Sequence, residues 1–119
     1  MLLDDGRYGD QQIVSKLAVH RATWETSPHR LDNTLKVPLR YSAGMMLGGE
    51  PFGLFGPHTG SAFGHLGLVK ICAWADPGRA LSVALLSTGT PLLAHNAPAL
   101  IQLLREINNQ IPRGRRTRQ

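Results

Sequence analysis

The chemistry open to this sequence depends first on its histidines and serines, because these side chains supply bases and nucleophiles. The five histidines, His20, His29, His58, His65 and His95, do not fall at metal-ligand spacings on a shared element. No serine is followed by lysine three positions later, so no hydroxyl has a local base to activate it. Gly-x-Ser-x-Gly, a phosphate loop with lysine, His-Glu-x-x-His and Cys-x-x-Cys are also absent. We therefore expect no catalytic residue, metal site or cofactor within these 119 residues.

The remaining candidate residues are best explained by packing or by turns. Cys72 lies in an apolar run and is predicted to be a buried structural thiol. Trp24 and Trp74 are predicted to pack in the core or at its rim. Asp76 and Arg79 belong to one turn, in which the aspartate accepts local backbone hydrogen bonds and the arginine is solvated. The loop histidine His58 has no visible partner.

Two helices are predicted at opposite ends of the chain. Leu2 and Leu3 resemble the last turn of a helix that begins upstream, closed by Gly6 in a left-handed cap. Ser15 can cap a short helix from Lys16 to about Trp24. A longer helix is expected from Asn96 to about Gln110. It has Pro98 in its first turn and one apolar side, which consists of Leu100, Ile101, Leu104 and Ile107.

The middle of the chain has the composition of strands and turns. Residues 27–38 are polar and interrupted by proline, so a connecting loop is predicted there. Strands are predicted over residues 40–47, 63–75 and 80–88. The last two flank Asp76-Pro77-Gly78-Arg79, a sequence that suits a type II turn and therefore an antiparallel hairpin.

These elements predict an α+β unit, a three-stranded antiparallel sheet with the carboxy-terminal helix packed on one face. Residues 83–86 are apolar on both sides of the pleat, so the second face of the sheet should also meet protein. This chain does not obviously supply that cover. We expect one partial domain over residues 1–111, followed by a basic disordered tail over residues 112–119.

Charge and hydropathy narrow the classes of partner. The net charge is +5, but four arginines lie in the last seven residues, so the body of the chain is nearly neutral. Binding of nucleic acid by the arginine tail is therefore the less favoured alternative, and a solvated terminus is the simpler interpretation. The sequence predicts no membrane span and no signal segment. As written, the chain is expected to be cytoplasmic, and the compartment of a full-length parent stays open.

One ordered set of segments resembles a known family. Phe63-Gly64-His65-Leu66-Gly67 is followed by a strand, the turn at residues 75–79 and the strand at residues 81–89. Together with Met1-Leu2-Leu3-Asp4-Asp5-Gly6 and Ile13-Val14-Ser15, this order is similar to the carboxy-terminal part of the serine β-lactamase-related family. That family includes class C β-lactamases, penicillin-binding proteins, D-aminopeptidases and carboxylesterases. The resemblance covers nearly the whole chain except the basic tail, and it implies the carboxy-terminal portion of a β-lactamase-like α/β sandwich.

The resemblance also implies a partial acylation site. The family uses a Ser-x-x-Lys helix, a Tyr-x-Asn or Ser-x-Asn loop and a Lys-Thr-Gly-like triad on a strand, and only the triad has a counterpart here, His65-Leu66-Gly67. By resemblance the backbone N–H of Leu68 would help to form an oxyanion hole. His65 and Leu66 replace the usual lysine and threonine, a pattern associated with esterase-like and peptidase-like branches.

Three hypotheses arise from the sequence. The first is a carboxy-terminal fragment of a serine acyl hydrolase that acts on a small ester or amide. Its nucleophile and base lie upstream of Met1, so the fragment is inactive without the missing amino-terminal part. The second is a non-catalytic module whose bare sheet face and edge pair with a second copy or another chain. The third is that the arginine tail binds nucleic acid and the rest of the chain serves as its scaffold.

Overall fold

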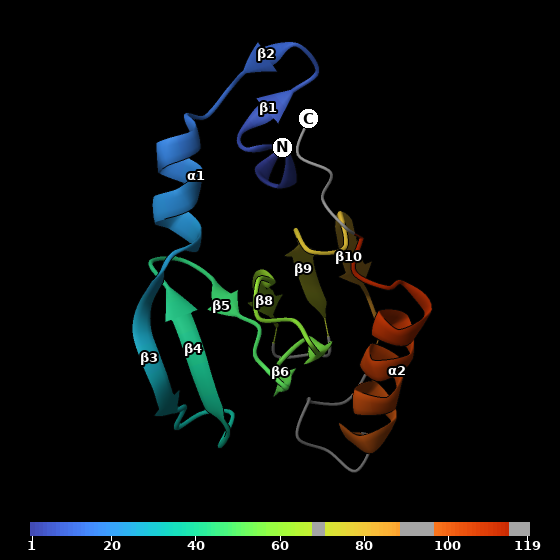
Figure 1. Cartoon of the computed structure of the whole chain (residues 1–119). Helices are drawn as coiled ribbons and strands as arrows, with labels where there is room; N and C mark the ends of the chain where they lie inside the picture. The colour runs from blue at the N-terminus through green and yellow to red at the C-terminus, as the bar shows by residue number, and fades with distance from the viewer. Residues whose placement is uncertain (68–70, 89–96, 115–119) are drawn as a thin grey trace.

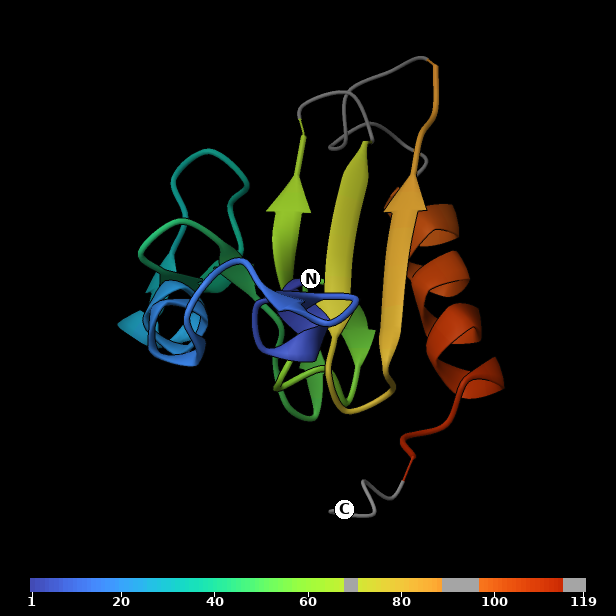
Figure 2. The same ribbon diagram turned by 90° about the horizontal axis from the view of Figure 1, so that it is seen from above.

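The computed structural model describes residues 1–67, 71–88 and 97–114, and an antiparallel sheet of six strands lies at its centre (Figures 1 and 2). The α+β class is confirmed, whereas the expectation of three strands is wrong. In spatial order the strands are β10 (Leu81–Leu85), β9 (Cys72–Asp76), β8 (Phe63–Leu66), β5 (Met46–Leu47), β4 (Pro38–Ser42) and β3 (Glu25–Leu31).

The additional strands have two sources. Residues 27–38 were expected to form a loop, but β3 begins at Glu25 and pairs with β4, with two register shifts along the ladder. Two of the predicted strands are each divided into a pair of antiparallel strands, β4 with β5 and β8 with β9. Each predicted run contains a break that its apolar composition hides, at residues 43–45 in the first run and after Leu66, where β8 ends, in the second.

The amino-terminal segment lies over one face of the sheet, where η1 (Leu2–Asp4) contacts β9 (Figure 1). It continues through β1 (Arg7–Tyr8) and β2 (Gln11–Gln12), which form a small hairpin. Asp5 and Gly6 both have positive φ, 53° and 87°, so the predicted left-handed ending of a helical turn is confirmed. The turn itself is a 3₁₀ helix.

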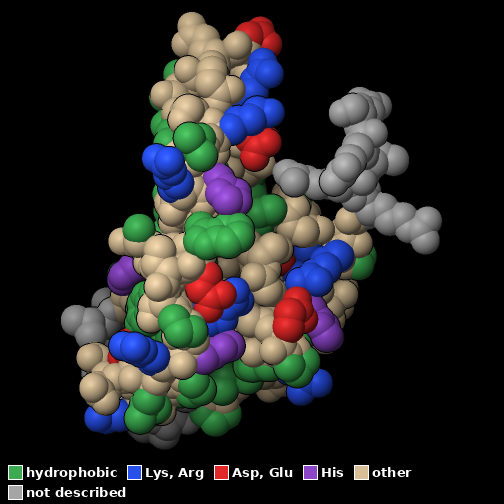
Figure 3. Space-filling view, turned by 60° about the vertical axis from the view of Figure 1, so that its left-hand side comes forward, with side chains coloured by type: hydrophobic (Ala, Val, Ile, Leu, Met, Phe, Trp, Pro, Cys, Tyr) green, Lys and Arg blue, Asp and Glu red, His purple; other side chains and the backbone are tan. Residues whose placement is uncertain are grey.

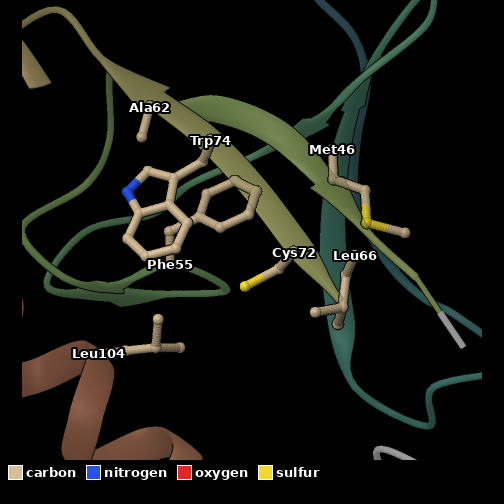
Figure 4. Packing of buried hydrophobic residues seen from close by; sticks show 7 residues of the cluster. All are labelled: Met46, Phe55, Ala62, Leu66, Cys72, Trp74 and Leu104. Carbon is tan, nitrogen blue, oxygen red and sulfur yellow. The ribbon is translucent and has the colours of Figure 1, made fainter. Parts of the chain in front are cut away.

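Both predicted helices are present. α1 (Lys16–Thr23) is capped by Ser15, whose Oγ accepts the N–H of Ala18 at 3.2 Å. α2 (Ala97–Gln110) packs on the other face of the sheet, through Leu104 at the centre of the contact (Figures 1 and 4). Ile101 is 47% exposed, so the prediction that it shares the buried side of this helix is wrong.

The core lies between the sheet and α2 (Figure 4). Trp74 is buried there and stacks on Phe55 with ring centroids 5.5 Å apart. Cys72 is buried beside it, and burial raises the pKa of its thiol, as expected for a structural cysteine. The other tryptophan, Trp24, is 61% exposed, and its ring lies 4.9 Å from that of His20.

The loop between β5 and β8 is compact. It carries the small hairpin of β6 (Phe52–Gly53) and β7 (Gly56–Pro57) and a fully buried threonine, Thr59. Asn108 of α2 donates hydrogen bonds from its Nδ2 to the carbonyl oxygens of Phe55 and Leu104, at 2.7 and 2.8 Å. This amide therefore holds the loop against the helix. Neither helix in the described part of the chain has the length and hydropathy needed to cross a membrane.

Candidate functional site

His65 lies on β8, on the face of the sheet opposite the core, and its side chain is exposed. It pairs in register with Ala73 of β9, and β10 continues this face through Ser82 and Ala84. All three of these neighbours are exposed and small. The histidine therefore stands above a low, open surface, where a second body can approach its imidazole ring.

One edge of β8 is also open beside His65. β5 has only two residues, and its register with β8 ends at the pair Met46 and Gly64. Within the described ranges, no strand pairs with His65 on the side opposite β9. Among the described strands this half of the edge has no partner, and an unpaired strand edge presents free N–H and C=O groups to an extended ligand.

Two glycines keep the backbone close to its neighbours at this site. A Cβ on Gly64 would lie 2.2 Å from the carbonyl oxygen of Ala73, so only glycine allows β8 and β9 to pair as they do. Gly67 donates its N–H to the carbonyl oxygen of Ile71 at 2.6 Å, which closes the connection after β8. The contacts of Gly64 and Gly67 therefore fix the backbone just before and just after His65.

The other two predicted site residues, Leu66 and Leu68, do not place a side chain on this face within the described residues. The side chain of Leu66 is buried in the core beneath the sheet, so it presents only its backbone to this face. Leu68, the expected oxyanion donor, lies outside the described residues. Within the described part of the chain, the candidate site thus consists of the exposed imidazole of His65 and the backbone of β8.

A buried polar network lies at the turn between β9 and β10, and the sequence did not indicate it. Asp76 and Arg79 form an ion pair with side chains 0% and 5% exposed, so the expectation of a solvated arginine is wrong. Arg79 also donates from Nε to the carbonyl of Ile111 at 2.8 Å and from Nη1 to that of His58 at 2.9 Å. Asp76 accepts the hydroxyl of Ser61 at 3.1 Å.

The same network explains the shape of the turn. Oδ1 of Asp76 accepts the N–H of Gly78 at 2.9 Å, as predicted for the aspartate of a turn. Gly78 does not have the positive φ that a type II turn requires at its third position, so that turn type is wrong. The left-handed residue is Ala80, at φ 51°. The turn keeps its backbone hydrogen bond from the N–H of Arg79 to the carbonyl of Asp76, at 3.1 Å, and the side chain of Asp76 caps it in addition.

His58 has a partner that the sequence did not reveal. Its Nδ1 lies 2.9 Å from Oε2 of Glu50, and Oε1 of the same carboxylate receives a hydrogen bond from Arg113. The hydrogen bond from His58, followed by those from Arg113 and the N–H of Gly60, lowers the pKa of Glu50 to about 2. This exposed cluster ties the segment after α2 to the loop before β8. It contains no nucleophile.

A second ionic cluster lies at the opposite side of the sheet. Arg40 of β4 donates to Glu25 of β3 and to the carbonyl of Gly48, both at 2.8 Å. The hydrogen bond from Arg40 lowers the pKa of Glu25. Desolvation and a hydrogen bond to Asp32 raise the pKa of Tyr41 to about 12.

Charges of both signs are spread over the face seen in Figure 3, with no basic patch on it.

These geometries limit the chemistry of the described residues. Ser61 donates to a carboxylate that is already paired with Arg79, and the ring of His58 is paired with Glu50 rather than with a hydroxyl. No group of three or more His, Cys, Asp or Glu side chains in the described ranges could hold a metal ion. The arrangement at His65 can position a ligand and donate hydrogen bonds to it.

Among solved structures, the fold of this chain matches that of a penicillin-binding protein homolog from Caulobacter crescentus. The match has a TM-score of 0.70 and 27% sequence identity, and it covers 89% of this chain. It covers 28% of the homolog, so this chain spans little more than a quarter of that protein's length. No protein-family model matches the sequence, and no curated protein does either. The fold is thus that of part of a penicillin-binding-protein-like domain.

Proposed function

We propose that this chain is the carboxy-terminal part of a serine acyl hydrolase of the β-lactamase-related family, and that it supplies one wall of the acylation site. The observation that carries the proposal is the match to the penicillin-binding protein homolog, which covers nearly all of this chain and only 28% of the homolog. The open face and half-open edge at His65 are consistent with it, because they leave room for the rest of a site.

In this proposal the two parts have different roles. A serine oxygen from the missing part attacks the carbonyl carbon of an ester or amide, the bond to the alcohol or amine breaks, and the leaving group takes a proton. Water then releases the acid and restores the serine. The present chain contributes the β8 backbone, with the N–H of Leu68 as the expected oxyanion donor by resemblance, and His65 as a contact to the substrate.

Reconstitution tests this division of roles. The chain would be co-expressed with the Caulobacter homolog from which the matched region has been deleted, and a fluorescent fluorophosphonate would label any activated serine. We expect labelling of the homolog fragment only when the present chain is also there, and none of this chain alone. His65→Ala should reduce the labelling rate, whereas His29→Ala, an exposed histidine on β3, should leave it unchanged.

Two outcomes would reject the proposal. Serine-dependent turnover of p-nitrophenyl acetate by the present chain alone would show that it contains its own nucleophile. A stable complex of the two parts with no labelling would show that the match in fold does not extend to the chemistry.

A second candidate function is self-association, favoured by the edge strand β10. Its five residues, Leu81 to Leu85, carry no charge, and Leu86 just beyond it is 77% exposed. Unprotected edge strands readily pair with another chain. We expect the isolated chain to form an oligomer or to be poorly soluble. A monomer at high concentration in size-exclusion chromatography with light scattering would contradict this expectation.

A further inference from the structure

A cavity of about 300 Å³ lies between the β3–β4 hairpin, the loop that carries β6, and α2. Its lining includes His29, Leu39, Arg40, Leu47, Phe52 and Ile101. The cavity is separate from the His65 site. Leu47 pairs with Phe63, at the start of β8, whereas His65 lies toward the other end of that strand.

The walls of the cavity are largely apolar. Among its lining residues Leu39 and Leu47 are buried, whereas Phe52 and Ile101 are 49% and 47% exposed. Exposed large apolar side chains that converge on one hollow are uncommon on a protein surface and often mark a binding site. The volume is at the lower end of the range for small-molecule pockets. The hollow therefore suits a small apolar group.

The ionisable side chains that line the cavity are all basic. The ionisable groups in the lining are Arg40 and His29, and no carboxylate is among the lining residues. Glu25, the partner of Arg40, does not line this cavity, although both residues line a second hollow beside Trp24. A guanidinium has five N–H donors, so Arg40 can bind Glu25 and the carbonyl of Gly48 and still donate to a third acceptor.

We propose that this cavity binds a small amphiphilic anion, a single carboxylate on a short unbranched apolar chain. The chain would lie among Leu39, Leu47, Phe52 and Ile101, and the carboxylate would accept hydrogen bonds from Arg40 at the polar end. This site is independent of the proposed acyl hydrolase function, because none of its residues belongs to the His65 site.

Sodium octanoate and 1-octanol form a matched pair of probes, with equal chain length and a charge on only one of them. Titration calorimetry of the full chain should give saturable octanoate binding with a 1:1 ratio. We expect octanol to bind at least tenfold more weakly, because it cannot form the charge-assisted hydrogen bond with Arg40. Equal affinity for the two probes would overturn the proposal, as would the absence of saturable octanoate binding.

Variants of Ile101 locate the site. Ile101→Glu and Ile101→Lys remove the same apolar contact but place opposite charges at the mouth of the cavity. We expect Ile101→Glu to weaken octanoate binding at least tenfold and to weaken it more than Ile101→Lys does. Leu103→Glu is the matched control, since Leu103 is similarly exposed on α2 but does not line the cavity.

The three variants would be compared only after their urea unfolding midpoints have been shown to match that of the parent chain. If one of them fails to fold, Phe52→Ala provides a second test at an exposed position, with the same expected loss of octanoate affinity. Unchanged octanoate affinity in a folded Ile101→Glu or Phe52→Ala variant would show that the ligand binds elsewhere and would overturn the proposal.

Discussion

The two hairpins at the edges of the sheet, β9–β10 and β3–β4, use the same interaction in different surroundings. Each joins an arginine to a carboxylate, Arg79 to Asp76 and Arg40 to Glu25. The side chains of the first pair are 5% and 0% exposed, and those of the second pair are 21% and 35% exposed. Because water competes for exposed charges, we expect the first pair to contribute far more to stability than the second.

The two edge strands, β3 and β10, also differ in how readily they can pair with another strand. β3 contains Pro28, charged residues at both of its ends and two register shifts, all of which hinder pairing with another strand. β10 is a regular, uncharged strand that pairs without shifts on its one partnered side. The sheet therefore has one protected edge, β3, and one receptive edge, β10.

The largest expected effect comes from breaking the buried pair. Arg79→Met would leave the carboxylate of Asp76 buried without its ion-pair partner and would remove the side-chain donor to the carbonyl of Ile111. The carbonyl of His58 would keep its hydrogen bond from Arg113. Removing one member of a buried pair costs about 3–5 kcal/mol of the free energy of unfolding. Urea unfolding followed by tryptophan fluorescence measures this loss, because Trp74 lies in the core.

The double variant Asp76→Asn with Arg79→Met is the control, and it should be less destabilised than Arg79→Met alone because no charge is left buried. A loss of less than about 1 kcal/mol in the free energy of unfolding of Arg79→Met would mean that the buried pair contributes no more than an exposed ion pair does. The contrast between the two hairpins would then disappear.

The next prediction concerns the receptive edge. Ala84→Lys puts a charge on the exposed face of β10, and we expect it to weaken self-association about tenfold, or about 1.4 kcal/mol. Thr26→Lys places the same charge on the exposed face of β3 and should change association little. Light scattering across a concentration series measures both. Equal effects at the two edges would show that association does not use β10.

How far the sequence predicts this fold depends on whether its signals are local. The β9–β10 hairpin, the capped helix α1 and the helix α2 follow from neighbouring residues, and all three are present, although Ile101 does not lie on the buried side of α2. β3 was missed because an exposed edge strand has no buried side to create alternation, and because Pro28 indicates a loop. The same features that protect this edge conceal it in the sequence.

Prediction of the candidate functional site from the sequence is limited in the same way, to what neighbouring residues reveal. That His65 lies on a strand beside glycines could be predicted from the residues around it. The burial of Arg79 could not, since its carbonyl partners at His58 and Ile111 are 21 and 32 residues away in the chain. The Glu50, His58 and Arg113 cluster likewise joins segments that are adjacent only after folding. Interactions between distant segments leave no local pattern.

A smaller effect is expected at Glu50, on the β10 side of the molecule. Its folded pKa of about 2 lies below the ordinary value of 4.5, so ionised Glu50 stabilises the fold above pH 4.5 and this contribution is lost as the pH falls toward 2. Glu50→Gln should therefore lower the thermal unfolding midpoint at pH 6 by more than at pH 3. A midpoint difference that does not depend on pH would contradict the assigned ion pairs.

The smallest effect is expected at Glu25, in the partly exposed pair of the β3–β4 hairpin. The hydrogen bond from Arg40 lowers the pKa of this carboxyl below 4.5, so its contribution to stability is present above that value and is lost as the pH falls through the lowered pKa. Glu25→Gln should lower the unfolding midpoint at pH 6 by less than Glu50→Gln does, and far less than Arg79→Met. Thermal unfolding of the three variants in one buffer gives this order directly. If Glu25→Gln were as destabilising as Arg79→Met, burial would not be what separates the two hairpins, and the protected edge would owe its stability to its ion pair.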